Sequence, residues 1–180
     1  MFQRGGSYAA GGRARIVLTG LVLAALAGCW REDEGALRNR MERWFAIGET
    51  VAFHATGDCA AAVFRLVQME VKAPLSVVSA APEVPGMLSR RGAVALHDPT
   101  LAPDVALAEI VNTDRPTGMN MRRAALEGRM CMNAHTESAF RYALDNPRTV
   151  LAYDADPSTI MLMDPHTGLL VVAMGAVEWL

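Results

Sequence analysis

Residues 149–174 read TVLAYDADPSTIMLMDPHTGLLVVAM and carry the clearest secondary-structure signal in the chain. Three runs of β-branched and apolar residues, at 149–153, 159–163 and 169–174, predict β-strands. The last two runs are joined by DPHTG at 164–168, in which proline comes early and glycine comes last. That order suits a type I turn followed by a left-handed residue, the usual construction of a longer hairpin loop. The stretch therefore predicts antiparallel strands that finish in a C-terminal β-hairpin.

Helices are expected before these strands, each with a capping side chain near its start. The three nearest the strands are 105–111 capped by Asp104, 119–132 preceded by Thr117, and 137–144 capped by Thr136. Another helix is expected over 35–47, with Asp33 as its cap and Gly48 as its stop. Its apolar residues recur at helical spacings of three and four, at Leu37, Met41, Trp44 and Phe45.

Further strands are expected at 50–55 and 59–67, joined near Thr56-Gly57-Asp58. The second of them also fits a helix over 60–68 that Asp58 would cap, and the sequence leaves this alternative open. Short strands are expected at 75–80 and 92–96, separated by a proline-rich stretch that runs over the surface. The sum is a single globular α+β domain over 35–180, in which helices pack on one face of an antiparallel sheet.

The composition is that of an ordinary globular protein. Of the 180 residues, 52% are apolar and three are cysteines, which excludes a disordered chain, collagen and a disulfide-dense mini-protein. The first 28 residues hold three arginines and no acid, so from Cys29 onward 14 basic residues face 19 acidic ones. A surface with that excess of acid repels phosphate, so no nucleic-acid partner is expected.

The N-terminal segment has the three-part layout of an export signal. A basic stretch ends at Arg15, an apolar run covers 16–26, and the small residues Ala27 and Gly28 precede Cys29. An eleven-residue helix is only about 16 Å long, roughly half of the hydrocarbon thickness of a bilayer. We therefore expect residues 1–28 to be a signal peptide and not a permanent membrane span or a buried core helix.

Leu26-Ala27-Gly28-Cys29 resembles the lipobox of bacterial lipoproteins. The resemblance covers about the first 29 residues. It implies that the Cys29 thiol receives a diacylglyceryl group, that the mature protein begins at Cys29, and that residues 29–34 form a lipidated tether. Two or more long acyl chains satisfy the requirement for stable membrane attachment. The residue after Cys29 is Trp30 and not Asp, the inner-membrane retention signal of enteric bacteria, so the outer membrane is the expected destination of this periplasm-facing protein.

Acylation of Cys29 would leave an even pair of cysteines, Cys59 and Cys131, in an oxidising compartment. We therefore predict a disulfide between them. The alternative is two separate buried thiols, which is a common environment for cysteine.

Catalytic and metal-binding signals are weak in this sequence. On a continuous helix His135 would lie on the same face as Cys131, where an imidazole could activate a thiolate. Cys131 is, however, expected to be part of the disulfide and would then have no free thiol. The same objection meets His54 with Cys59. Other candidate ligands match no recognised zinc or calcium pattern, so no metal or other cofactor is expected. They are His97, Asp98, His135, Glu137 and His166 for zinc, and Asp154, Asp156 and Asp164 for calcium.

Arginine recurs every seven residues at Arg115, Arg122 and Arg129, which would form a basic stripe if one helix contained all three. A solvated helix face explains such a stripe, and contact with anionic headgroups or glycan phosphate is its functional interpretation.

Two function hypotheses follow. The first is a lipid-anchored binding or structural component of the envelope, with a protein or glycan partner. The second is an envelope hydrolase whose active site no motif reveals, because the serine-hydrolase elbow and the glycine-rich nucleotide loops are missing. The first is favoured.

Overall fold

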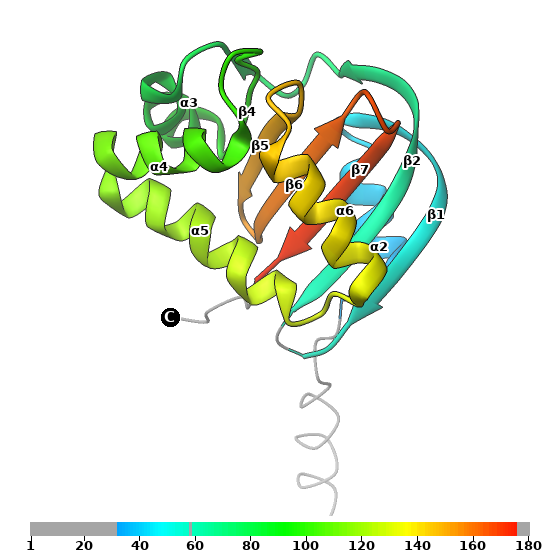
Figure 1. Ribbon diagram of the computed structural model, residues 1–180. Coiled ribbons are helices and arrows are strands. Elements are labelled where there is room, and N and C mark those ends of the chain that lie inside the picture. Colours follow the sequence, from blue (N-terminus) through cyan, green and yellow to red (C-terminus); the bar gives the residue numbers. More distant parts are fainter. Residues whose placement is uncertain (1–31, 58, 176–180) are drawn as a thin grey trace, which may run out of the picture. The chain divides into compact units, whose positions relative to one another are not determined.

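The C-terminal hairpin forms the middle of the sheet in the computed structural model, which describes residues 32–57 and 59–175 (Figure 1). Strands β5 (Val150–Ala155), β6 (Ser158–Asp164) and β7 (Leu169–Met174) are antiparallel neighbours. Gly168 has a positive φ of 67° and donates its N–H to the Asp164 carbonyl at 3.0 Å. The hairpin and its left-handed glycine are therefore confirmed.

The remaining strands extend the sheet on both sides, in the order β1-β2-β7-β6-β5-β4-β3. β2 (Ala60–Val71) pairs with β7, and β1 (Phe45–Ala55) lies outside it as one edge. On the other side, β4 (Ala93–Leu96) pairs with β5. The short edge strand β3 (Val77–Val78) runs parallel to β4, in the one parallel pairing among the described strands. The segment at 60–68 is thus a strand and not the alternative helix.

Four helices cover one face of this sheet. They are α3 (Val84–Arg91), α4 (Pro103–Thr113), α5 (Arg115–Arg129) and α6 (Ala134–Asp145), with a 3-10 turn, η1 (Ala81–Glu83), before the first. Figure 1 shows α6 lying across β6 and β7, while α4 lies to the side, next to α5 and α3. Helix α5 also contacts β6 and β7. Ile110, Met121 and Phe140 from the helices join Ile160 and Val171 from the strands in one buried cluster. The expected α+β fold is confirmed.

The opposite face of the sheet is also buried, which the sequence did not predict. Helix α2 (Glu34–Met41) places Leu37 and Met41 in a second cluster with Phe64, Met161 and Val172. Burial on both faces explains why β5, β6 and β7 lack an apolar and polar alternation. The described residues all fall within one compact unit.

The first helix is shorter than expected. α2 ends at Met41, and β1 begins at Phe45, which pairs with Val71 across the sheet. Trp44 and Phe45 continue the apolar spacing of the helix because they are buried in the same cluster as its side chains, although they are not part of the helix. The expected cap is confirmed, because the Asp33 carboxylate accepts the N–H of Ala36 at 2.8 Å.

The other caps were expected at the wrong residues. Asp114 caps α5 by accepting the N–H of Thr117 at 3.0 Å, and Asn133 caps α6 by accepting the N–H of Thr136 at 2.9 Å. Thr136, which was expected to cap its helix, and Thr117, which was expected just before its helix, thus lie three positions inside the helices and donate their backbone N–H groups. Helix α4 likewise begins earlier, after Ala102.

Helix α3 was not expected at all. Its proline, Pro85, lies in the first turn, where no backbone N–H is needed, and Gly92 ends the helix with a φ of 74°. Two prolines of the stretch that was expected to run over the surface, Pro82 in η1 and Pro85 in α3, therefore mark helix starts. Within the described part of the chain, no helix is both long and apolar enough to cross a membrane.

Candidate functional site

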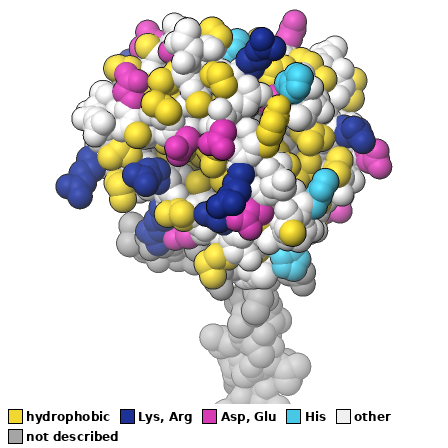
Figure 2. Space-filling model, in the orientation of Figure 1, with side chains coloured by type: hydrophobic (Ala, Val, Ile, Leu, Met, Phe, Trp, Pro, Cys, Tyr) yellow, Lys and Arg dark blue, Asp and Glu magenta, His cyan; other side chains and the backbone are white. Residues whose placement is uncertain are grey.

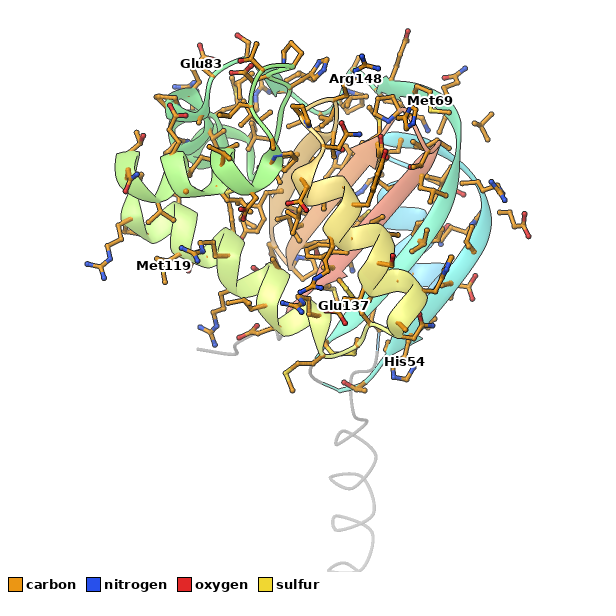
Figure 3. The ribbon with its side chains drawn as sticks, viewed as in Figure 1. His54, Met69, Glu83, Met119, Glu137 and Arg148 are labelled. Carbon is orange, nitrogen blue, oxygen red and sulfur yellow. A yellow bond between two sulfur atoms is a disulfide. The ribbon has the colours of Figure 1, made fainter. Side chains whose placement is uncertain are left out.

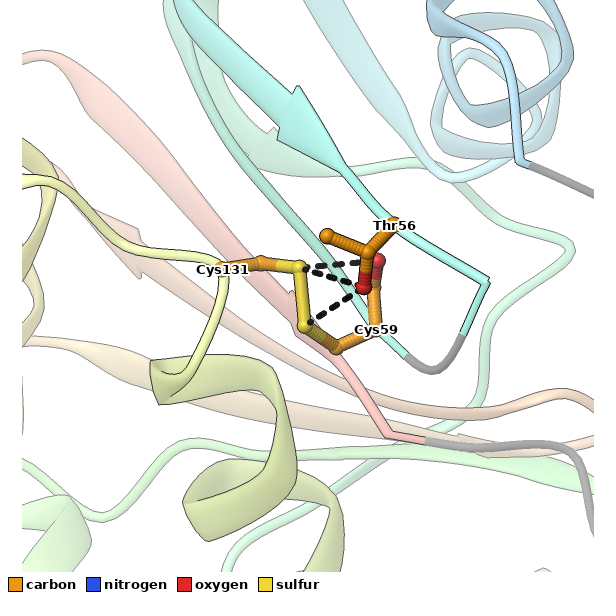
Figure 4. The surroundings of a disulfide bond; sticks show 3 residues. All are labelled: Thr56, Cys59 and Cys131. Atoms are coloured by element: carbon orange, nitrogen blue, oxygen red, sulfur yellow. Dashed lines mark hydrogen bonds between the residues drawn. A yellow bond between two sulfur atoms is a disulfide. The ribbon is translucent and has the colours of Figure 1, made fainter.

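The Cys59–Cys131 disulfide joins the start of β2 to the turn after α5 (Figure 4). Its Cα atoms are 5.8 Å apart, and both residues are buried among Ala61 and Met132. The Thr56 hydroxyl lies 3.6 Å from the Cys59 sulfur and 3.5 Å from the Cys131 sulfur. Since a disulfide sulfur carries no hydrogen, the hydroxyl is the donor in these contacts. The predicted pairing is confirmed.

The disulfide removes the candidate nucleophile. Cys131 has no thiol to ionise, so the Cys131 and His135 pair cannot act as an activated thiolate in this structure. His54 beside Cys59 is excluded in the same way. The geometry therefore supports a structural role for both cysteines and not a catalytic one.

The four histidines are all exposed and are spread over the domain. His54 is in β1, His97 follows β4, His135 is in the first turn of α6, and His166 is in the β6–β7 turn. Glu137 forms ion pairs with Arg129 and with Arg141. Within 32–57 and 59–175, no three His, Cys, Asp or Glu side chains are gathered as metal ligands.

The three aspartates considered for calcium do not form a site together. Asp154 pairs with Thr159 at the start of β6, whereas Asp164 ends that strand. The buried Asp164 carboxylate accepts bonds from the Asn146 amide, the His166 N–H and the Thr167 hydroxyl, at 3.1, 2.9 and 2.7 Å. It is therefore a structural residue that fixes the hairpin turn.

A groove of about 230 Å³ runs between α6 and β7. His135, Ser138 and Tyr142 line it from α6, and Thr167 and Leu169 line it from the hairpin. The three α6 residues share a face because they are spaced three and four apart. This groove is where the structure brings the predicted His135 together with other polar side chains.

A larger cleft of about 540 Å³ lies among α4, α5 and α6. It combines apolar and charged side chains, namely Phe140 and Leu144 with Asp104, Arg129, Arg141 and Asp145. The sequence alone did not indicate this cleft. The signal was present in α6, where Phe140 with Leu144 and Arg141 with Asp145 are both spaced four apart, but its partners on α4 and α5 appear only in the fold.

Asp154 is the carboxylate with the most altered acidity among the described residues. It is 6% exposed on the α2 side of the sheet. Burial raises its pKa to about 6, against the opposing effects of the Asp156 N–H, which it accepts at 3.2 Å, and of the charges on Arg40 and Arg43. Burial also raises the pKa of the neighbouring Tyr153, whose hydroxyl is 2.8 Å from that of Ser158.

Replacing Asp154 with Asn is expected to stabilise the protein above pH 6 by about 1 kcal/mol, because Asn carries no charge at the buried position. This value is smaller than the full pKa shift would give, because water still screens part of the carboxylate charge. The ordinary pKa is 3.8 and the folded value is about 6. The folded state therefore binds more protons between these values, and the free energy of unfolding falls as the pH rises through them. In Asp154→Asn that fall should disappear from urea denaturation curves measured across this range.

The matched control for this pH experiment is Glu70→Gln, which removes an exposed carboxylate from β2. It should keep the native pH dependence. Parallel curves for the native protein and Asp154→Asn would show that Asp154 is not the group responsible.

All three arginines of the predicted stripe lie on α5. The helix begins at Arg115 because Pro116 is tolerated in its first turn. Arg115, Arg122 and Arg129 are exposed. Two large apolar side chains lie on the same helix beside them, Leu126 at 60% exposure and Met119 at 46%. Figure 2 shows basic side chains gathered over the part of the surface that α5 occupies.

No protein-family model, no curated protein and no solved structure matches this chain.

Proposed function

We propose that this chain is a lipid-anchored protein of the bacterial cell envelope, with a binding or structural role. Cys29 carries the acyl chains, and the domain faces the periplasm, from the outer membrane in preference to the inner one. The partner is an envelope protein or glycan. This proposal combines the lipobox resemblance with the chemistry of the described domain.

The arrangement of the sulfur atoms carries the proposal. The chain has three cysteines, and two of them form a buried disulfide. Such bonds persist in oxidising compartments, which supports export of the domain. The one remaining cysteine is the one at the lipobox, so its thiol is available for acylation.

The cleft among α4, α5 and α6 supports a binding role. Its floor includes the buried Phe140, and its charged residues carry both signs. An apolar floor with a charged rim is the usual composition of a protein-binding patch. A protein segment is therefore the partner that this surface fits.

The groove beside α6 favours one alternative, a hydrolase, because His135 and Ser138 line it together. A serine hydroxyl needs such a base to act as a nucleophile. His135→Ala separates the two functions: turnover of a model ester or peptide that this variant loses would favour the hydrolase. The binding role predicts no turnover that depends on His135.

The anchor is tested by Cys29→Ala in cells grown with labelled fatty acid. We expect the variant to lose the label and to leave the membrane fraction, because the thiol that bears the acyl chains is gone. Trp30→Phe, which alters the next residue and keeps the thiol, is the control and should stay labelled and membrane-bound. Persistent labelling of Cys29→Ala would refute the lipoprotein assignment.

A further inference from the structure

Among the residues that the structure describes, the C-terminal end of α5 has large apolar side chains that are exposed. Met130, which caps the helix, is 83% exposed, more than any other large apolar side chain in the described residues. Leu126, one turn earlier, is 60% exposed. Arg122 lies a further turn back on the same face. An apolar tip beside a cationic side chain is the pattern of helices that enter a membrane interface.

This tip lies at the end of the domain where the described chain begins. Glu32, the first described residue, pairs with Arg40 at 3.1 Å, and Arg40 donates to the Met174 sulfur at 3.5 Å. Met174 packs against α5 so closely that a Cβ on Gly128 would lie 2.9 Å from its backbone nitrogen. A short series of contacts thus connects Glu32 to the last turn of α5.

The β1–β2 turn lies at the same end. The disulfide ties Cys59, at the end of this turn, to Cys131, the neighbour of Met130. In Figure 3, His54 marks this end of β1, whereas Met69 marks the opposite end of the sheet. Thr56 and Gly57, the exposed residues described in the turn, are small and uncharged, and Asp58 is the one charged residue between β1 and Cys59 in the sequence.

The length of chain between the anchor and the domain limits where the bilayer can be. Three peptide bonds separate Cys29 from Glu32, so their Cα atoms can be at most about 11 Å apart. If Cys29 is acylated, its thioether lies at the headgroups. The domain must then approach the bilayer with the end that contains Glu32, and this is the end that exposes Met130.

We propose that the last turn of α5 rests on the phospholipid bilayer that holds the anchor, with Met130 and Leu126 in the interface and Arg122 toward the lipid phosphates. The proposal rests on the lipid anchor of the proposed function. It fixes the orientation of the domain, with Arg129 of the cleft among α4, α5 and α6 one residue from the Met130 that meets the bilayer. Asp33 and Glu34 follow Glu32 directly and therefore lie at this same end, at the start of α2, which packs on the other face of the sheet from α5.

A photoreactive benzophenone side chain at single methionine positions tests this orientation. The full chain, processed and acylated in cells, is reconstituted in vesicles of phosphatidylethanolamine and phosphatidylglycerol and irradiated. Positions 130, 119 and 69 are compared, because all three hold exposed methionines. Met119 lies on the same helix about 16 Å from Met130, and Met69 lies at the opposite end of the sheet.

We expect a phospholipid adduct at position 130 with a yield about five-fold above that at 119 or 69, because only the interfacial side chain meets lipid. Intact mass reports the adduct and the acylation of Cys29 in one spectrum. An acylated chain with equal yields at the three positions, or with no adduct at 130, overturns this inference and leaves the anchor standing. A chain without acyl groups overturns both.

Discussion

Reducing the Cys59–Cys131 disulfide is expected to lower the free energy of unfolding by about 4.4 kcal/mol, the chain-entropy value for a loop of this length. The two cysteines are 72 residues apart, and the loop between them contains β2, β3, β4 and three of the helices that cover the sheet. Cutting this crosslink lets the unfolded chain expand. A domain of this size has a net stability of only about 5–15 kcal/mol, so the loss is a large part of it.

Urea denaturation with and without reductant measures the effect. The double variant Cys59→Ala with Cys131→Ala should reproduce it in the absence of reductant, because small apolar residues suit the buried site beside Ala61 and Met132. Reductant should change the stability of the native protein and leave that of the double variant unchanged. A loss below about 1 kcal/mol would mean that the crosslink does not restrain the unfolded chain in the way this mechanism requires.

The sequence predicted the strands of the C-terminal half well. β7 has the bounds that its run of Leu, Val and Ala residues indicated, and the glycine at 168 has the positive φ that its loop demanded. These are local signals, in which neighbouring residues determine the conformation. The disulfide was also predictable, because it follows from the count of cysteines once Cys29 is assigned to lipid.

Helix boundaries were less predictable. Around α5 and α6, a Thr lies three residues after an Asp or Asn, and each of these residue types can cap a helix. The sequence does not say which one accepts the bond and which one donates its N–H. The choice depends on where the helix must begin in order to pack, and the packing is a property of the fold.

The candidate site was the least predictable part. The cleft takes Asp104 from α4, Arg129 from α5 and Arg141 from α6. The exposed tip of α5 became a candidate membrane contact only when the contacts of Arg40 and Met174 connected it to the start of the described chain. Such long-range neighbours leave no periodic trace in a single sequence.

Gly118→Ala is expected to destabilise the domain by about 3 kcal/mol, the upper part of the range for overpacking a close contact. Helices α4 and α5 are separated by Asp114 alone, and their backbones meet where Gly118 passes Val111. A Cβ on Gly118 would lie 2.5 Å from both the backbone nitrogen and the Cα of Val111. A flexible side chain can move aside, but the backbone of a packed helix cannot do so without shifting α4 from the sheet.

Gly86→Ala in α3 is the matched control. A Cβ there would have only the Arg90 guanidinium near it, at 3.8 Å. Because alanine favours a helix more than glycine does, this variant should gain about 0.5–1 kcal/mol. The same intrinsic gain operates at Gly118, so opposite signs for the two variants isolate the cost of the close contact.

Urea denaturation gives the two free energies, and amide hydrogen exchange locates the damage from Gly118→Ala. Relative to the native protein, Gly118→Ala should increase the amide exchange rates of α4 and α5 more than those of β6. The reason is that α4 must move away to admit the new methyl group, whereas the central strand β6 keeps its neighbours. If Gly118→Ala proved as stable as the native protein, the two helices could not cross at the distance described. The cleft that they form with α6 would then need a different geometry.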